Sequence, residues 1–229
     1  MPTPEPTHRL VLFDLDGTLA DTAPDLAYAL NQTLLRQGRE ALPFAAIRPH
    51  VSHGGIALIR LGFGIGPEHP EFDTLRQRFL DIYLANLTRE TRLFPGMEQV
   101  LAWLEQRDIP WGVVTNKPAW LTDPLMRQLG LDRRAAAIVS GDTLERRKPH
   151  PDPILYACEA ASVAPAQTLY VGDARRDIEA GNRAGTTTLA ALFGYIEEQD
   201  DPRDWQADGM IEAPREILPW VLQDTATAI

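Results

Sequence analysis

The second half of the chain alternates short apolar runs with helical patterns, and this alternation constrains the fold more than any other feature. The apolar runs that predict strands are WGVVT (111–115), AAIVS (136–140), TLYVG (168–172) and TTTLAALFG (186–194). Helical patterns at about 119–129, 153–161 and 174–184 lie between them. Strands that alternate with helices of this length form right-handed crossovers, so the sequence predicts a parallel sheet.

A long helical segment interrupts this alternation near the N-terminus. Another apolar run, LVLF (10–13), predicts one more strand, and the helical patterns DLAYALNQTLLRQ, GGIALIRLGF and EFDTLRQRFLDIYLANL follow it within about residues 22–91. About seventy residues far exceed what a crossover between strands needs. We therefore expect the α/β class, with a Rossmann-like parallel sheet core formed by residues 1–20 and 92–229 and an inserted helical cap at 21–91.

Composition excludes several classes of protein. The chain has 229 residues and a net charge of −10, which disfavours binding to nucleic acid. No run approaches the ~18 apolar residues of a membrane span, and the polar start MPTPEPTH indicates a flexible tail rather than a signal peptide. We expect a cytoplasmic protein. Cys158 is the one cysteine, and its helical context favours a buried structural thiol over a nucleophile.

Two aspartates follow the first predicted strand. Asp14 and Asp16 are two positions apart, so their side chains would point the same way if the strand continued. Two carboxylates held close repel each other unless a divalent cation offsets them or one carries a proton. The ordinary alternative is an Asp-Gly turn at the end of a strand, formed by Asp16 and Gly17.

More polar residues follow the other predicted strands. Parallel sheets bind ligands beyond the C-terminal ends of their strands. The residues near those ends are Thr115, Asn116, Lys148, Asp173 and Asp177. Together with Asp14 and Asp16 they offer oxygen ligands for Mg²⁺, donors for phosphate oxygens and a carboxylate that can attack. Taken singly, each has an ordinary explanation: a helix cap, a surface lysine, or acids favoured by a helix dipole.

Four motifs in chain order resemble one known family. DLDGT, VVTNK, RRKPHPDP and VGDARRD are similar to the motifs of the haloacid dehalogenase superfamily of phosphatases. Within it the chain resembles the phosphoglycolate phosphatase group, whose members carry a helical cap. The resemblance implies that Asp14 is the nucleophile that forms an aspartyl-phosphate, and that Asp16 is the acid and then the base.

The same resemblance implies the remaining site residues. Thr115, Asn116 and Lys148 would hold the phosphoryl oxygens. Mg²⁺ would bind Asp14, the backbone carbonyl of Asp16, and Asp173, with Asp177 in support. The two aspartates after the first strand would then differ in protonation state, because Asp14 must be ionised to attack and Asp16 must begin protonated.

The sequence leaves two candidate substrates, each of which carries both a phosphate and a carboxylate. The phosphoglycolate phosphatase group implies 2-phosphoglycolate. VSHGG (51–55) and FGYIEEQDDPRDWQAD (193–208) resemble the branch that acts on N-acetylmuramic acid 6-phosphate in cell-wall recycling, which favours the sugar phosphate. His53 and Gly54, ahead of an apolar helical pattern, are the candidate cap residues for the carboxylate. We expect a small phosphorylated metabolite as partner and leave the oligomeric state open.

Three rival functions remain. A receiver module also combines acids, a threonine and a lysine on a parallel sheet, but it has no seventy-residue insertion and needs no second carboxylate beside the acceptor. A dehalogenase has no alkoxide leaving group, so it gives no reason for an acid at Asp16. A phosphomutase related to β-phosphoglucomutase differs from a phosphatase only in its product.

Overall fold

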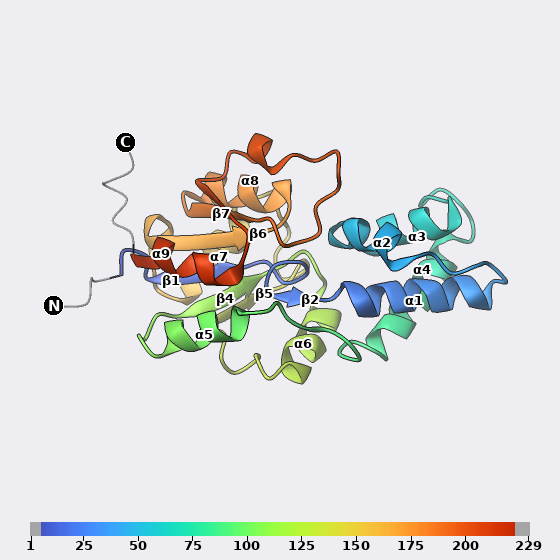
Figure 1. Ribbon diagram of the computed structural model, residues 1–229, viewed down its shortest axis with the longest axis horizontal. Helices are drawn as coiled ribbons and strands as arrows, with labels where there is room; N and C mark the ends of the chain where they lie inside the picture. Colours follow the sequence, from blue (N-terminus) through green and yellow to red (C-terminus); the bar gives the residue numbers. More distant parts are fainter. Residues whose placement is uncertain (1–5, 223–229) are drawn as a thin grey trace.

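The computed structural model describes residues 6–222 and contains a six-stranded sheet in the order β5-β4-β1-β6-β7-β8 (Figure 1). All neighbouring strands are parallel. The strands are β1 (Leu10–Phe13), β4 (Trp111–Val114), β5 (Ala137–Val139), β6 (Thr168–Gly172), β7 (Thr187–Ala191) and β8 (Gly209–Ile211). β1 lies at the centre, and its four residues are all buried, as expected of a strand covered on both faces.

Helices cover both faces of this sheet. Val11 and Phe13 of β1 pack with helices on one face, whereas Leu10 and Leu12 pack with helices on the other. The first set of helices is α5 (Met97–Glu105), α6 (Ala119–Gln128) and α9 (Ile217–Leu222), and the second is α7 (Asp152–Ala160) and α8 (Arg175–Ala184). Side chains alternate along a strand, so one buried strand contributes to both halves of the core.

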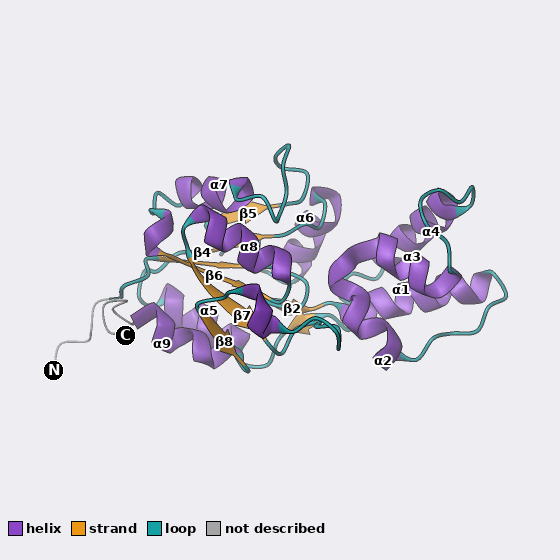
Figure 2. Cartoon of the chain, turned by 90° about the horizontal axis from the view of Figure 1, so that it is seen from above, coloured by secondary structure: helices purple, strands orange, loops and turns teal. Residues whose placement is uncertain are grey.

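Four further helices lie together beside the sheet, beyond its edge in both views (Figures 1 and 2). They are α1 (Ala23–Arg36), α2 (Phe44–Ile47), α3 (Gly54–Phe63) and α4 (Phe72–Leu84), with the 3₁₀ helix η1 (Arg48–His53) between α2 and α3. The chain reaches them through β2 (Ala20–Asp21) and returns through β3 (Arg92–Leu93), and these two strands pair antiparallel. The two ends of the helical segment are therefore held side by side.

The structure confirms the expected α/β class with its Rossmann-like parallel sheet, which shares the chain with a helical insertion. Every predicted strand exists, and each predicted helix is observed to within a few residues. The sequence analysis did not predict the helices α2, α5 and α9 or the strands β2, β3 and β8. Among the described residues no helix has the length and apolar character needed to cross a membrane.

The predictions for Cys158 and for the N-terminal tail have different outcomes. Cys158 is buried in α7, where burial raises the pKa of its thiol, as expected of a structural cysteine. The sequence predicts a flexible tail over residues 1–8, and residues 1–5 of that tail lie outside the described residues. His8 departs from that expectation, because it is buried and its ring bonds to the Trp220 carbonyl and the Thr187 hydroxyl at 2.8 and 2.9 Å.

Candidate active site

The residues expected at the site come together at the C-terminal edge of the sheet. Asp14 follows β1, Thr115 follows β4 and Asp173 follows β6, and these three strands are neighbours in the sheet. Asp177 lies in the first turn of α8, and Lys148 lies in the loop before α7. This is the edge where parallel sheets bind ligands, so the topology brings together residues separated by up to 163 positions in the chain.

Lys148 is completely buried among oxygen atoms. Its Nζ lies 2.9 Å from Asp14 Oδ1 and 2.8 Å from Asp177 Oδ1. It also donates to the Val114 carbonyl at 2.7 Å and to the Tyr170 hydroxyl at 2.9 Å. The contact with Asp177 is an ion pair without hydrogen-bond alignment. A buried ammonium needs such partners, because an unpaired charge away from water is strongly destabilising.

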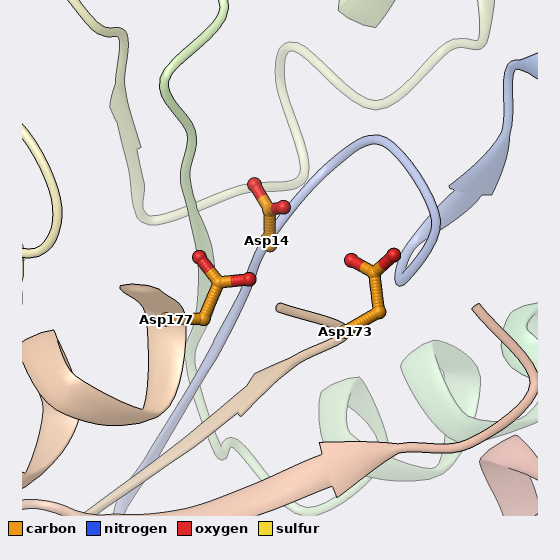
Figure 3. Close-up of side chains that lie close together, drawn as sticks. All are labelled: Asp14, Asp173 and Asp177. Carbon is orange, nitrogen blue, oxygen red and sulfur yellow. The ribbon is translucent and has the colours of Figure 1, made fainter. Parts of the chain in front are cut away.

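Three buried carboxylates, those of Asp14, Asp173 and Asp177, lie close together at this edge of the sheet (Figure 3). Oxygen atoms of Asp14, Asp173 and Asp177 all lie within 4.8 Å of one another. Burial, together with the charges of Asp14 and Asp177, raises the pKa of Asp173 to about 7. A divalent cation among these oxygens would remove that repulsion, and carboxylate oxygens are the ligands that Mg²⁺ prefers. The donor set therefore fits Mg²⁺.

Asp173 is oriented by three hydrogen bonds. Thr18 donates to Oδ1 at 3.0 Å, while the Ser52 hydroxyl and the Tyr195 backbone N–H both donate to Oδ2 at 2.9 Å. Gly17 has a φ of +91°, and a Cβ there would collide with this carboxylate. Position 17 therefore requires glycine both for its backbone conformation and for the close approach of Asp173.

Asp16 has a different environment from Asp14. Lys117 Nζ and the Thr22 hydroxyl both donate to Asp16 Oδ1, at 2.8 and 2.6 Å. Burial lowers the pKa of Lys117, whereas its contacts with Asp16 and Tyr83 raise it, and the net shift is upward. Asp16 is not a member of the three-carboxylate cluster, and both of its side-chain hydrogen bonds among the described residues fall on one oxygen.

Thr115 and Asn116 are held by the backbone around them. Thr115 Oγ1 accepts the Lys117 N–H at 3.1 Å, which leaves its hydroxyl hydrogen to donate. Asn116 donates from Nδ2 to the Lys148 carbonyl at 2.9 Å, and its Oδ1 is buried without a partner among the described residues. Asn116 therefore ties the end of β4 to the Lys148 loop.

A cavity of about 560 Å³ joins these residues to the inserted helices. The core residues that line it include Asp14, Asp16, Thr115, Asn116, Lys117 and Lys148. The opposite wall comes from η1, α3 and α4, and it includes His53, Gly54, Arg76 and Tyr83. Asp173 and Asp177 are not among the lining residues, although their oxygens lie within 4.8 Å of those of Asp14, which is.

The segment η1 contacts the loop after β7. His50 Nδ1 and His53 Nε2 lie 2.7 and 3.1 Å from the same oxygen of Glu197, Oε1. Arg48 donates to the carbonyls of Phe193 and Gly194, each at 3.0 Å. The two segments singled out for substrate choice, 51–55 and 193–208, therefore touch each other through His53 and Glu197. The role of His53 and Gly54 as substrate contacts stays a prediction.

Several residues of the site were not anticipated from the sequence. Lys117 was part of a quoted motif but was not assigned a role, although it directly follows Asn116. Ser52 and Arg176 also lay within quoted segments without an assigned role. In the structure Arg176 donates to the Ser52 carbonyl at 2.9 Å, and the Ser52 hydroxyl donates to Asp173. Lys117 could have been found from the sequence, because it belongs to the quoted motif VVTNK. The Ser52 contacts could not, because they depend on how η1 packs against Asp173 and Arg176.

Comparisons with known proteins identify a family and several relatives. The family model described as haloacid dehalogenase-like hydrolase matches residues 11–191. The N-acetylmuramic acid 6-phosphate phosphatase of Pseudomonas putida is 42% identical over 91% of this chain and 94% of that protein. The phosphoglycolate phosphatase of Xanthomonas campestris pv. campestris is 44% identical over the same shares.

Solved structures show the same fold. The crystal structure of a predicted phosphoglycolate phosphatase from Haemophilus somnus has a TM-score of 0.83 and 28% identity, and the similarity covers 93% of this chain and 97% of that one. The family model covers most of the chain. Relatives that are 40–44% identical to this chain confirm the prediction that it is a phosphatase of this family. This chain belongs to the haloacid dehalogenase-like hydrolases.

Proposed function

We propose that the chain is a Mg²⁺-dependent phosphomonoester hydrolase that acts through an aspartyl-phosphate on a small phosphorylated metabolite. One observation carries this proposal: Asp14 and Asp16 line one cavity but have different partners. Asp14 lies against the Lys148 ammonium at 2.9 Å, as a nucleophilic carboxylate requires. Asp16 accepts both of its hydrogen bonds on Oδ1, which leaves Oδ2 for the proton of a general acid.

The residues that would hold Mg²⁺ are Asp14, Asp173 and the backbone carbonyl of Asp16, with Asp177 in support. Asp177 suits a supporting role because both of its oxygens have partners, Lys148 at Oδ1 and the Ala174 N–H at Oδ2. When bound, the ion supplies positive charge that offsets the carboxylates and the charge of the phosphoryl group. The convergence of three buried carboxylates supports this assignment.

The proposed reaction has two steps. A carboxylate oxygen of Asp14 forms a bond to phosphorus, the ester P–O bond breaks, and the leaving oxygen takes the proton from Asp16. Asp16 then removes a proton from water, the water oxygen bonds to phosphorus, and the bond between Asp14 and phosphorus breaks. Lys148, Thr115 and Asn116 hold the phosphoryl oxygens, and the free hydroxyl hydrogen of Thr115 supports that role.

The helices α1–α4 act in this proposal as the cap that excludes water and reads the rest of the substrate. Its expected bounds, residues 21–91, are supported by the pairing of β2 with β3. The substrate is a carboxylate-bearing phosphate ester, 2-phosphoglycolate or N-acetylmuramic acid 6-phosphate, since relatives at 44% and 42% identity are named for these two activities. The cytoplasmic location stays a prediction.

The test is a panel of small phosphomonoesters incubated with enzyme and Mg²⁺. We expect free phosphate in amounts equal to the alcohol released. An isomerised sugar phosphate without phosphate release would indicate the mutase instead. Direct comparison of kcat/KM for the two acids decides between them.

We predict that Mg²⁺ is required and that it stabilises the protein. Chelation with EDTA should abolish turnover, and Ca²⁺ should restore little of it, because Ca²⁺ prefers more ligands and longer bonds. Added Mg²⁺ should raise the Tm of the EDTA-treated protein more at pH 8 than at pH 5, since protons compete for the ligands. Full activity after exhaustive chelation would contradict the metal assignment.

The sign of the pH effect follows from Asp173. Its pKa is about 7 in the folded protein against 3.8 as the ordinary value, so the folded state holds this proton more tightly. Without metal, the stability that this proton contributes is complete below pH 3.8 and is lost as the pH rises through about 7. Calorimetry of the metal-free protein between pH 5 and pH 8 measures the trend.

A further inference from the structure

The cap wall of the cavity carries an arginine at one end of an apolar helix face. Arg76, Phe79, Leu80 and Tyr83 of α4 all line the cavity. Their spacing of three, four and seven positions places them on one side of the helix. Phe79 and Tyr83 are completely buried and Leu80 is 7% exposed. The guanidinium of Arg76 thus shares the cavity with three large apolar or aromatic side chains.

Arg76 has an unmet hydrogen-bond donor. Its Nε is buried and has no partner among residues 6–222. None of the ion pairs formed within these residues includes Arg76. A buried donor without a partner costs free energy, and an arginine can recover it only by binding an acceptor. The cavity is where such an acceptor can reach it.

The charges around the cavity point to an anion at this wall. The acids that line it are Asp14, Asp16 and Asp142, and all three come from the sheet side. The cap contributes Arg76 and His53 but no acid. His53 already has a carboxylate partner, because its Nε2 lies 3.1 Å from Glu197 Oε1. Of the two basic cap residues that line the cavity, Arg76 is therefore the one without an acidic partner among residues 6–222.

We infer that Arg76 binds the carboxylate of the substrate and so selects phosphate esters that carry a second anionic group. This inference rests on the proposed function, which places the phosphate at Asp14 across the same cavity. The planar guanidinium can donate two parallel hydrogen bonds to a carboxylate, a geometry that suits this group better than a lysine would. A cavity of about 560 Å³ also accommodates a sugar-sized body between the two anions.

The test compares Arg76→Gln with Arg78→Gln on matched pairs of esters. Arg78 lies on the same helix, is exposed and does not line the cavity, so its replacement makes the same charge change elsewhere. The first pair is N-acetylmuramic acid 6-phosphate and N-acetylglucosamine 6-phosphate, which lacks the lactyl carboxylate. The second pair is 2-phosphoglycolate and 2-hydroxyethyl phosphate.

For the carboxylate ester that the wild type prefers, Arg76→Gln should lower kcat/KM by about 10- to 100-fold, the range for a hydrogen bond to a charged group. The loss on its neutral counterpart should be several times smaller, and Arg78→Gln should show no such difference. Arg76→Lys keeps the charge but not the paired donors, so we expect an intermediate loss, mostly in KM.

Equal losses on both members of a pair, or no loss on either, would overturn the role of Arg76 while leaving the phosphatase intact. Failure of the wild type to release phosphate from any ester with Mg²⁺ would instead overturn the proposed function, and this inference with it. The Tm of each variant shows whether it is folded, and Arg76→Lys supplies the comparison if Arg76→Gln is not.

Discussion

Asp14→Asn should abolish phosphate release, with a loss of at least about 10⁴-fold, because an amide keeps the shape of the side chain but is no nucleophile. The protein should remain folded. Lys148 keeps the Asp177 carboxylate, the Val114 carbonyl and the Tyr170 hydroxyl as partners. The substitution also removes one of three clustered negative charges. Steady-state phosphate release and the Tm measure the two parts of this prediction.

Asp142→Asn is the matched control for Asp14→Asn. Asp142 also lines the cavity, and among the described residues its Oδ1 accepts the Ala119 backbone N–H, at 2.8 Å. It is not a member of the three-carboxylate cluster. The control should retain most of the activity. Turnover near the wild-type rate by Asp14→Asn would refute the assignment of the nucleophile.

Asp16→Asn should reduce turnover of alkyl phosphates by about 10²- to 10⁴-fold, the range for a lost general acid or base. Asparagine still offers an oxygen to Lys117 and Thr22, so the local structure should survive. The two steps should separate with p-nitrophenyl phosphate, whose leaving group departs without a proton. We expect a rapid burst of about one p-nitrophenol per enzyme, followed by slow turnover, because the second step still needs a base.

The burst distinguishes a lost proton transfer from a damaged site. If Asp16 only stabilises the fold around Lys117, the variant should lose burst and steady state together and should melt at a lower temperature. A variant that hydrolyses alkyl phosphates as fast as the wild type would show that Asp16 transfers no proton.

The sheet could be predicted because its strands are buried on both faces and therefore appear as continuous apolar runs. LVLF, WGVV and TLYVG are each fully buried, as the runs indicated. Helix α5 was overlooked although Met97, Val100, Leu101 and Leu104 repeat with helical spacing and are all buried. The strands β2 and β3 have two residues each, too short to give any periodic signal.

The candidate site could be predicted only as far as its residues follow strands. Asp14, Thr115 and Asp173 follow β1, β4 and β6, so the parallel topology alone brings them to one edge. The environments of Lys117 and Arg76 could not be predicted in this way. Lys117 pairs with Asp16 beside the ring of Tyr83. The environments of Lys117 and Arg76 both depend on how α4 lies against the cavity. Such contacts between distant segments leave no local pattern in a single sequence.

The most direct test of the account is to trap the phosphoryl group on the enzyme. Asp16→Asn would be mixed with p-nitrophenyl phosphate and Mg²⁺, quenched in acid during the burst, reduced with borohydride and digested for mass spectrometry. The account predicts that residue 14 is converted to homoserine, the product of a reduced aspartyl-phosphate, and that Asp173 and Asp177 stay unchanged. Phosphate release without any modified aspartate, or modification at a residue other than 14, would contradict it.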